Sequence, residues 1–285
     1  DAIRGLMTHL AADGIPLLRL HHMASDGPIN AALRDIAQGA DTALATTRTF
    51  ERAILKSDLD ADAYLTSSIS KKKRKEYGRL NRRLADEGDV TFETPDMSDP
   101  ACVEGVVLEF PELERTGWKG DAGTAIASRP AEARFFVDAC RAAAATGNLS
   151  PLTLRLDNVP IASIINFKGS AARDTSLFSF KIAYDETYGR FSPGVLLELE
   201  LTARALAAND ITCVDSCANP DHPMIDHLWR ERRAMQDVTL ATSKATSAAL
   251  IGLTALSEKS AAATKRQIQS AAKALKKSLL KRKAA

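Results

Sequence analysis

The segment over residues 177–206, LFSFKIAYDETYGRFSPGVLLELELTARAL, constrains the fold of this chain most strongly. From Phe178 to Tyr184, apolar side chains alternate with small or polar ones, and this period of two indicates a β-strand. A polar turn follows, and Ser192 then offers a favoured N-cap while Pro193 suits the first position of a helix. The segment therefore predicts a buried strand that is joined by a tight turn to a helix over residues 193–207.

The start of this predicted helix has the features of an anion site. Gly194 removes a side chain where a ligand has to approach the backbone. The amides of Gly194, Val195 and Leu196 are expected to point outward at the positive end of the helix dipole. Arg190 precedes them and can neutralise phosphate charge. We interpret residues 190–196 as a pyrophosphate-binding turn, and a purely structural helix cap is the alternative.

The composition is that of an ordinary globular protein with one large or two modest domains. Of its 285 residues, 45% are hydrophobic and 26% are charged, and no apolar run is long enough to span a bilayer. The four cysteines show neither the pairing with histidine that indicates a zinc site nor a dense disulfide spacing. We therefore expect reduced thiols and a cytoplasmic location. The five histidines show no metal-ligand pattern, so we do not expect metal chemistry. The sequence contains no nucleophile elbow, so we do not expect a serine hydrolase.

Two segments are strongly basic although the net charge is only +2. Residues 244–285 carry ten Lys and Arg residues and one acid, a charge of +9, which leaves −7 for residues 1–243. We interpret this tail as a basic, Ala/Lys-rich helical appendage that can bind an anionic membrane or nucleic acid, or that remains a solvated extension. A predicted helix over residues 71–83 is also basic. We expect this helix to bind a CoA ribose phosphate, a tRNA backbone or an anionic membrane. The alternative is that its basic face is simply solvated.

The remaining patterns predict helices and strands in an α+β order. In the first part of the chain we expect a helix over 2–12, a strand over 16–20, a helix over 29–38 and a strand over 43–50. The next part predicts helices over 61–87, 100–113 and 131–145 and strands over 89–93, 152–156, 161–167, 177–184, 211–215 and 235–242. Gly88 is the C-cap candidate of the first of these helices, and Asp157-Asn158 is expected to form the hairpin turn between the strands over 152–156 and 161–167. These patterns divide the chain into a partial α/β domain (1–55), a larger α+β domain (56–243) and the basic tail (244–285).

This order of elements resembles the GNAT acyl-CoA N-acyltransferase fold, a mixed and mostly antiparallel sheet flanked by helices. Four local motifs resemble its CelD-type branch, acetyltransferase-like proteins associated with bacterial cellulose or exopolysaccharide genes. They are Ser70-Lys71-Lys72-Lys73-Arg74-Lys75 with Arg79 and Arg82-Arg83-Leu84; Gly117-Trp118-Lys119-Gly120 with Gly123-Thr124-Ala125; Phe180-Lys181-Ile182-Ala183-Tyr184-Asp185 with Ser192-Pro193-Gly194; and Asp221-His222-Pro223-Met224-Ile225. Of the spaced glycines in the family's pyrophosphate loop, this chain keeps Gly194.

The resemblance covers about residues 60–235 and implies an activity. It implies acetyl-CoA or another acyl-CoA as the donor and an amine, on a small molecule or a sugar, as the acceptor. Backbone groups near Ile182 and Ala183 would pair with the pantetheine arm as an added strand does. Such proteins are similar to Fem-type ligases in having two GNAT halves, so residues 1–55 would be the remainder of a first half. The alternatives are an aminoacyl-tRNA donor, as in Fem-type ligases, and a non-catalytic accessory protein.

Acyl transfer to an amine needs a group that takes a proton and donors that stabilise the oxyanion. Asp215 and His222 follow the last core strand and are the candidate bases. For His222, an N-cap or loop hydrogen bond is the alternative. Asp185 is placed to hold the incoming amine, or else is a surface turn acid. Lys181 is expensive on a buried strand face unless it is paired, so it either stabilises an oxyanion or pairs with an acid.

The acceptor pocket has three candidate residues. Trp118 and Lys119 lie in a glycine-flanked turn, where the indole can form a wall and the ammonium can bind an acidic or phosphate group. A core Trp beside a solvated Lys is the alternative. Tyr184 ends the strand that leads to the predicted pyrophosphate turn, and we include it among the substrate-binding residues.

Overall fold

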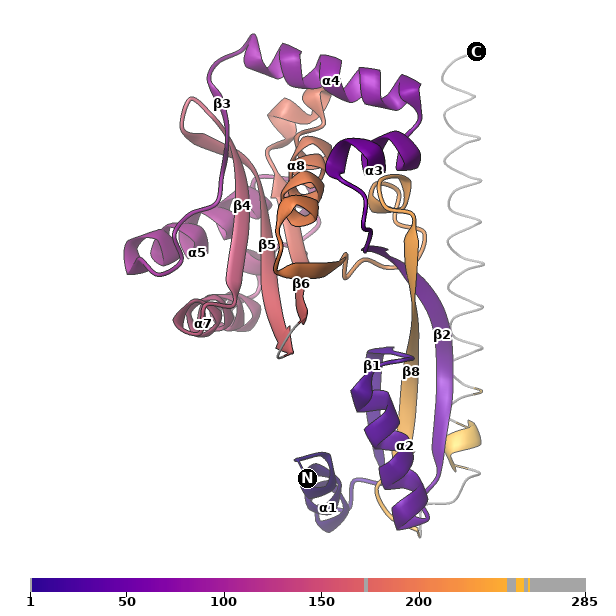
Figure 1. Cartoon of the computed structure of the whole chain (residues 1–285). Coiled ribbons are helices and arrows are strands. Elements are labelled where there is room, and N and C mark those ends of the chain that lie inside the picture. Colours follow the sequence, from indigo (N-terminus) through magenta and orange to yellow (C-terminus); the bar gives the residue numbers. More distant parts are fainter. Residues whose placement is uncertain (1, 172–173, 245–249, 254–255, 257–285) are drawn as a thin grey trace, which may run out of the picture. The chain divides into compact units, whose positions relative to one another are not determined.

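The computed structural model of the chain describes residues 2–171, 174–244, 250–253 and 256, and it contains two compact units. One unit combines residues 1–51 with residues 233–285, and the other comprises residues 52–232 (Figure 1). The boundary predicted at residue 55 lies close to the end of the first segment, whereas residues 233–243 group with the N-terminal residues. The prediction of a helical tail falls almost entirely outside the described residues.

The smaller unit is an α/β layer. It contains α1 (Ala2–Ala12), β1 (Leu17–Ala24), α2 (Pro28–Ala40), most of β2 (Leu44–Leu55) and most of β8 (Glu231–Ala241). Strands β1 and β8 pair in antiparallel fashion, and α2 packs Leu33 and Ile36 against Val238 and Leu240 of β8. The predicted helix–strand–helix–strand order is confirmed. Its sheet also requires a strand from the far end of the described chain.

The larger unit is an α+β domain around a mixed sheet, as predicted. Its helices are α3 (Ala61–Ser68), α4 (Lys71–Ala85), α5 (Pro100–Arg115), α6 (Trp118–Asp121), α7 (Pro130–Ala145) and α8 (Pro193–Ala207), with 3₁₀ turns η1 (Ile126–Ser128), η2 (Glu186–Phe191) and η3 (Ile225–His227). Its strands follow the order end of β2, β7 (Ile211–Asp215), β6 (Asp174–Tyr184), β5 (Val159–Ala171), β4 (Leu149–Leu156) and β3 (Val90–Glu93). Only the β6–β7 pair is parallel among these described strands.

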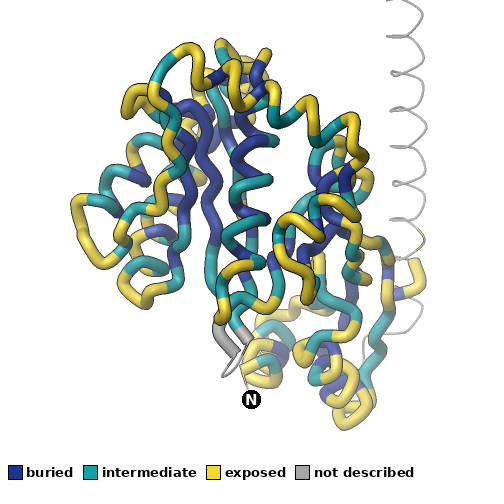
Figure 2. Tube along the Cα trace, turned by 45° about the horizontal axis from the view of Figure 1, so that its top comes forward, coloured by how far each residue is buried: buried dark blue, intermediate teal, exposed yellow. Residues whose placement is uncertain are grey.

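Helices cover both faces of this sheet. On one face α8 packs with α3 and α4, and on the other face lie α5 and α7 (Figure 1). Neighbouring residues of β5 separate onto these faces, since Ile164 joins the α8 cluster and Ile165 joins the α5–α7 cluster. The strands at the centre of the unit are accordingly buried in Figure 2, with exposed residues on the outer helices. Each fully buried large apolar side chain contributes about 1.5–3 kcal/mol, so this two-sided core holds the sheet in place.

The β4–β5 hairpin turns at Asp157 and Asn158, as predicted. Both residues have positive φ angles, 49° and 65°, as a two-residue type I′ turn requires. The Asp157 carboxylate also accepts the Asp89 N–H at 2.8 Å. A Cβ atom on Gly88 would collide with that carboxylate. Gly88 therefore permits this close approach and is not the C-cap of α4, which is Asp86.

The prediction of one helix over residues 61–87 is wrong, because the chain forms α3 and α4 with a break between them. Ile69 is extended (φ −116°, ψ 132°) and only 3% exposed, so it leaves the helical path to enter the core. Ser70 then starts α4, and its hydroxyl accepts the Lys73 N–H at 3.4 Å. A buried apolar residue followed by a local N-cap outweighed the continuous helical pattern.

Candidate functional site

The strands that flank α8 separate at their carboxyl ends. The parallel pairing of β6 and β7 runs from Thr175 opposite Ile211 to Phe178 opposite Asp215. Strand β7 ends there, whereas β6 continues along β5 as far as Tyr184. The carboxyl ends of parallel strands are where α/β sheets usually form ligand sites. The resulting notch, between the end of β6 and the start of α8, is the place where the sequence predicted a donor site.

The start of α8 does not have the predicted donor geometry. Ser192 is the N-cap residue of α8, as predicted, but it adopts a left-handed conformation (φ 54°, ψ 53°) and its side chain makes no capping hydrogen bond, so the predicted hydroxyl cap is absent. Its carbonyl accepts the N–H groups of Val195 at 2.9 Å and Leu196 at 3.1 Å. The prediction that these two amides face an anion is therefore wrong as well. Ser192 is turned because η2 runs directly into α8, closed by a Ser192 N–H bond to Gly189.

Side chains of the chain itself cover this helix start. Pro193 and Gly194 are buried. The Cβ position at Gly194 lies 3.5 Å from Tyr184 Cδ1, 3.7 Å from Ile182 Cδ1 and 3.9 Å from Met224 Sδ. A Cβ atom at this position would therefore make ordinary van der Waals contacts with β6 and with the loop after β7. The predicted seat for a diphosphate is filled by protein atoms in this structure.

Arg190, the predicted phosphate ligand, already has partners in the protein. Its Nη2 atom lies 2.9 Å from Oε1 of Glu87, and its guanidinium lies 4.6 Å from the centre of the Phe191 ring. The side chain is 61% exposed, so this ion pair contributes little to stability and can exchange with a ligand. A role for Arg190 in phosphate binding stays a prediction.

Asp215, a predicted base, is part of a buried ion pair. Its side chain is fully buried, and Arg52 Nη2 donates to Oδ2 at 2.7 Å while Nε lies 2.6 Å from Oδ1. Oδ1 also accepts the Cys217 N–H at 3.0 Å. The pair joins the end of β2 to the end of β7. A carboxylate held in this way has a structural role first, and a role as a proton acceptor is secondary to it.

Lys181 pairs with an acid, which is the alternative that the sequence left open. Its Nζ atom lies 3.0 Å and 3.3 Å from the two carboxylate oxygens of Glu114, which is buried. Glu114 also accepts the Ile126 N–H at 2.7 Å. This cluster connects β6 with α5 and η1, on the sheet face opposite α8. Its geometry is that of a satisfied core pair.

His222 and Asp185 each serve a local turn. His222 Nδ1 accepts from the amides of Met224 (3.4 Å) and Ile225 (3.3 Å), which are long bonds of the loop type predicted as the alternative. Burial lowers the pKa of His222, and Asp226 partly offsets this effect, so the ring is neutral at pH 7. Asp185 Oδ1 accepts the N–H and the hydroxyl of Thr187 at 2.9 and 2.8 Å. Catalytic roles for both residues stay predictions.

The acceptor-pocket residues lie in different places. Trp118 and Lys119 begin the short helix α6, and their side chains lie outside the described part of the structure. Tyr184 and Ile182 contact the start of α8, as described above. Ala183 alternates with them, and its side chain belongs to the α5–α7 cluster on the opposite face.

Glu198 is a candidate that the sequence analysis missed. It lies one turn after Gly194 on α8, is 4% exposed, and its Oε2 atom has no hydrogen-bond partner among the described residues. Burial raises its pKa to about 8. Residues four apart share a helix face, so Glu198 lies between Gly194, which contacts the end of β6, and Thr202, which accepts the Trp229 indole N–H at 2.9 Å. The available signal was a lone Glu within the apolar run Val195–Leu199.

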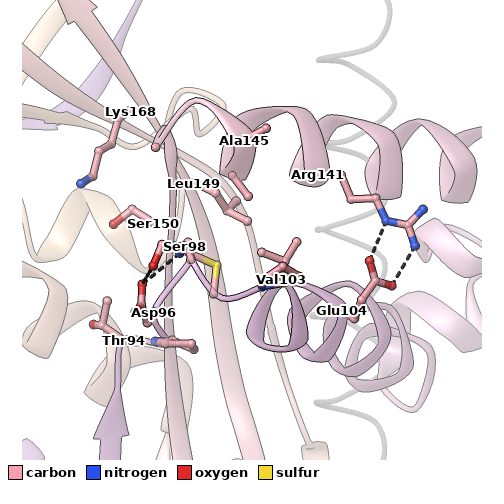
Figure 3. A pocket seen from close by; sticks show the side chains of 15 residues that line it. Thr94, Asp96, Ser98, Val103, Glu104, Arg141, Ala145, Leu149, Ser150 and Lys168 are labelled. Atoms are coloured by element: carbon pink, nitrogen blue, oxygen red, sulfur yellow. Dashed lines mark hydrogen bonds and ion pairs between the residues drawn. The ribbon is translucent and has the colours of Figure 1, made fainter.

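A separate polar groove lies on the α5–α7 side of the sheet. It has a volume of about 730 Å³ and lies between the loop after β3, the start of α5 and the end of α7 (Figure 3). Arg141 and Glu104 form an ion pair at 2.7 Å on its wall, and Asp96 accepts bonds from Ser98. Its charged groups are largely engaged with one another. In the part of the chain that the structure describes, no cluster of three metal-binding side chains occurs, and no helix is long and apolar enough to cross a membrane.

A comparison with protein families now identifies the class of this domain. The family model described as "Acetyltransferase (GNAT) domain" matches residues 71–222. These residues include β6, α8 and β7 and the notch between them. The chain belongs to this family of acetyltransferase (GNAT) domains. No curated protein sequence matches the chain.

Solved structures agree with this fold. A conserved protein of unknown function from Bacteroides thetaiotaomicron VPI-5482 is 11% identical, with a TM-score of 0.55 over 84% of this chain and 74% of that one. FemX is 10% identical, with a TM-score of 0.53 over 84% of this chain and 75% of its own. L-PGS from Bacillus licheniformis is 14% identical, with a TM-score of 0.49 over 86% and 73% of the two chains. The first two similarities, together with the family match, establish a GNAT-like fold.

Proposed function

We propose that this chain is an N-acyltransferase that moves an acyl group from a carrier to an amine. The observation that carries the proposal is the notch where β6 extends beyond the end of β7, within a domain of the acetyltransferase (GNAT) family. We expect an acyl-CoA to bind along β6 beyond the end of β7, where its amide-rich arm can pair with the strand edge near Ala183. The acceptor is an amine of a small molecule or a sugar.

The chemistry requires one proton to leave the amine. The amine nitrogen attacks the thioester carbonyl, the C–S bond breaks, and the products are an amide and a free thiol. We propose Glu198 as the group that takes the ammonium proton as the amide forms, since its pKa of about 8 keeps part of it ionised near neutral pH. The proton can then pass to the thiolate leaving group, so the enzyme ends in its initial state.

The donor is the least constrained part of the proposal. At the start of α8 only the Gly194 amide remains of the three predicted donors, and Tyr184, Ile182 and Met224 cover it. This observation favours a second donor class, aminoacyl-tRNA, which needs no diphosphate seat at that position. A link to cellulose or exopolysaccharide production remains an expectation from the CelD-type motifs. A non-catalytic accessory role is the remaining alternative.

Binding and turnover separate these readings. Isothermal titration with acetyl-CoA and longer acyl-CoAs is expected to show saturable binding, and an amine panel read by mass spectrometry is expected to show amide formation. Binding of tRNA that weakens steeply with salt would instead support the second donor. Folded protein that binds neither donor would refute the transferase proposal and leave the accessory role.

A pair of variants tests the proton acceptor. Glu198→Gln is expected to lower kcat by about 10²–10⁴-fold, and the wild-type rate is expected to rise with pH toward about pH 8, as Glu198 ionises. Glu132→Gln is the control, because Glu132 is half-exposed and pairs only locally with Arg129. An unchanged pH profile in Glu198→Gln would remove Glu198 from the mechanism.

A further inference from the structure

The outer face of α4 forms a strongly cationic groove. It has a volume of about 630 Å³ and is lined by Lys71, Arg74, Lys75, Gly78, Arg79 and Arg82. Among the described residues, no carboxylate lies within ion-pair distance of Lys71, Lys75 or Arg79. Two of these cations stand in the first turns of α4, where the helix dipole is positive and repels them. An anion bound here would relieve this repulsion.

An apolar cavity adjoins this groove. It has a volume of about 590 Å³ and lies between α3, α4, β3 and α8. Its apolar lining consists of Leu65, Ile69, Tyr77, Phe92, Leu196, Leu199 and Ala203. Of its two acids, Glu200 is paired with Arg204 at 2.7 Å, and Asp62 lies in the first turn of α3. A volume of this size is in the range of small-molecule sites.

Two residues line both the groove and the cavity, and they join the two spaces. Arg74 donates to the Thr66 hydroxyl at 2.5 Å, and its Nε atom is buried without a partner among the described residues. Gly78 is the other shared residue. It lies inside α4, where glycine is unfavourable, and its φ angle does not require glycine. Gly78 thus places no side chain where the groove and the cavity meet, and Arg82 Nη1 lies 3.6 Å from its Cβ position.

We propose that this joined site binds a lipid with a phosphate head group. The alkyl chain occupies the cavity, and the phosphate lies in the groove beside Arg74, Lys75 and Arg79. Nucleic acid explains the surface less well, because it would leave the apolar cavity unused and the groove presents no aromatic ring on which a base could stack. The proposal concerns binding alone and stands apart from acyl transfer.

Titration calorimetry with monomeric 1-oleoyl lysophosphatidic acid tests the proposal. Glycerol 3-phosphate supplies the head group alone, 1-oleoylglycerol supplies the chain alone, and tRNA supplies a polyanion without a chain. We expect lysophosphatidic acid to bind at least tenfold more tightly than glycerol 3-phosphate and 1-oleoylglycerol. Equal affinity for lysophosphatidic acid and for either fragment would overturn the proposal. So would competition between tRNA and lysophosphatidic acid, combined with no loss of affinity when the alkyl chain is removed from the lipid.

Two variants locate the binding within the joined site. Gly78→Leu places a side chain where the groove and the cavity meet and is expected to weaken lysophosphatidic acid binding at least tenfold. Gly105→Leu is the matched control, because Gly105 also lies inside a helix and has open space at its own Cβ position. Lys75→Gln with Arg79→Gln is expected to weaken lysophosphatidic acid and leave 1-oleoylglycerol unchanged. Wild-type affinity in Gly78→Leu, with the fold intact by circular dichroism, would overturn the assignment.

Discussion

The start of α8 and the outer face of α4 differ in whether the binding groups that their sequences supply remain accessible to a ligand. The Ser-Pro-Gly start of α8 has the residues of an anion site, yet its amides donate to Ser192 and its surface is covered by Tyr184, Ile182 and Met224. The basic face of α4 is a run of Lys and Arg residues without the features of a defined anion site, yet its cations line an open groove. A local pattern thus identifies which groups a segment contributes, whereas packing from distant segments decides which of them remain accessible.

The largest expected effect tests whether the charges near the notch are structural. Asp215→Asn leaves Arg52 buried without its counter-charge and is expected to lower the free energy of unfolding by about 3–5 kcal/mol. Urea unfolding measures this loss. Arg190→Ala is the control, since its pair with Glu87 is largely exposed and contributes at most about 1 kcal/mol. Unchanged stability together with lost turnover would make Asp215 a catalytic base instead.

A second prediction concerns the buried, unpaired carboxyl of Glu198. Its pKa is about 8 in the folded chain and 4.5 in the reference state, so between these values the folded protein binds the extra proton. The contribution of Glu198 to stability is therefore largest below about pH 4.5 and falls as the pH rises toward 8, with a slope of about 1.4 kcal/mol per pH unit. Glu198→Gln is expected to abolish this slope. Urea midpoints measured from pH 5 to pH 8 check it, and parallel curves for both proteins would contradict it.

The smallest expected effect sharpens the reading of the α8 start. A methyl group at Gly194 would make only ordinary contacts, at 3.5 Å with Tyr184 and 3.7 Å with Ile182. Gly194→Ala is therefore expected to change stability by no more than about 1 kcal/mol. If the helix start is closed as observed, acyl-CoA affinity is also unchanged. A tenfold loss of affinity in calorimetry would show that the helix start opens for a diphosphate.

Much of the fold was predictable because local signals agreed with the tertiary structure. The predicted bounds of α1, α8 and β7 coincide with the observed ones, and Pro193 did mark the start of α8. The Asp157-Asn158 turn was predictable because few other residues tolerate two consecutive positive φ angles. The break at Ile69 was not predictable from periodicity, since it depends on a core that the long helix would not reach.

The site was less predictable because its partners are far apart in the sequence. Lys181 and Glu114 are 67 residues apart, and Arg52 and Asp215 are 163 residues apart. No local pattern indicates that such charges are neutralised by each other. The α4 groove could not be recognised from its local sequence either. The apolar cavity beside its basic residues forms only because α3 and α8 pack next to α4.

The short β3 strand determines whether another chain can pair with this edge of the sheet in the larger unit. It has four residues, and its outer position follows from its pairing with β4 alone among the described strands. Glu93 at its end faces Arg155, which also contacts Glu109, so charged side chains surround this border. A brief, charged border is a poor template for a foreign strand. Self-association by sheet extension is thus discouraged at this edge of the sheet.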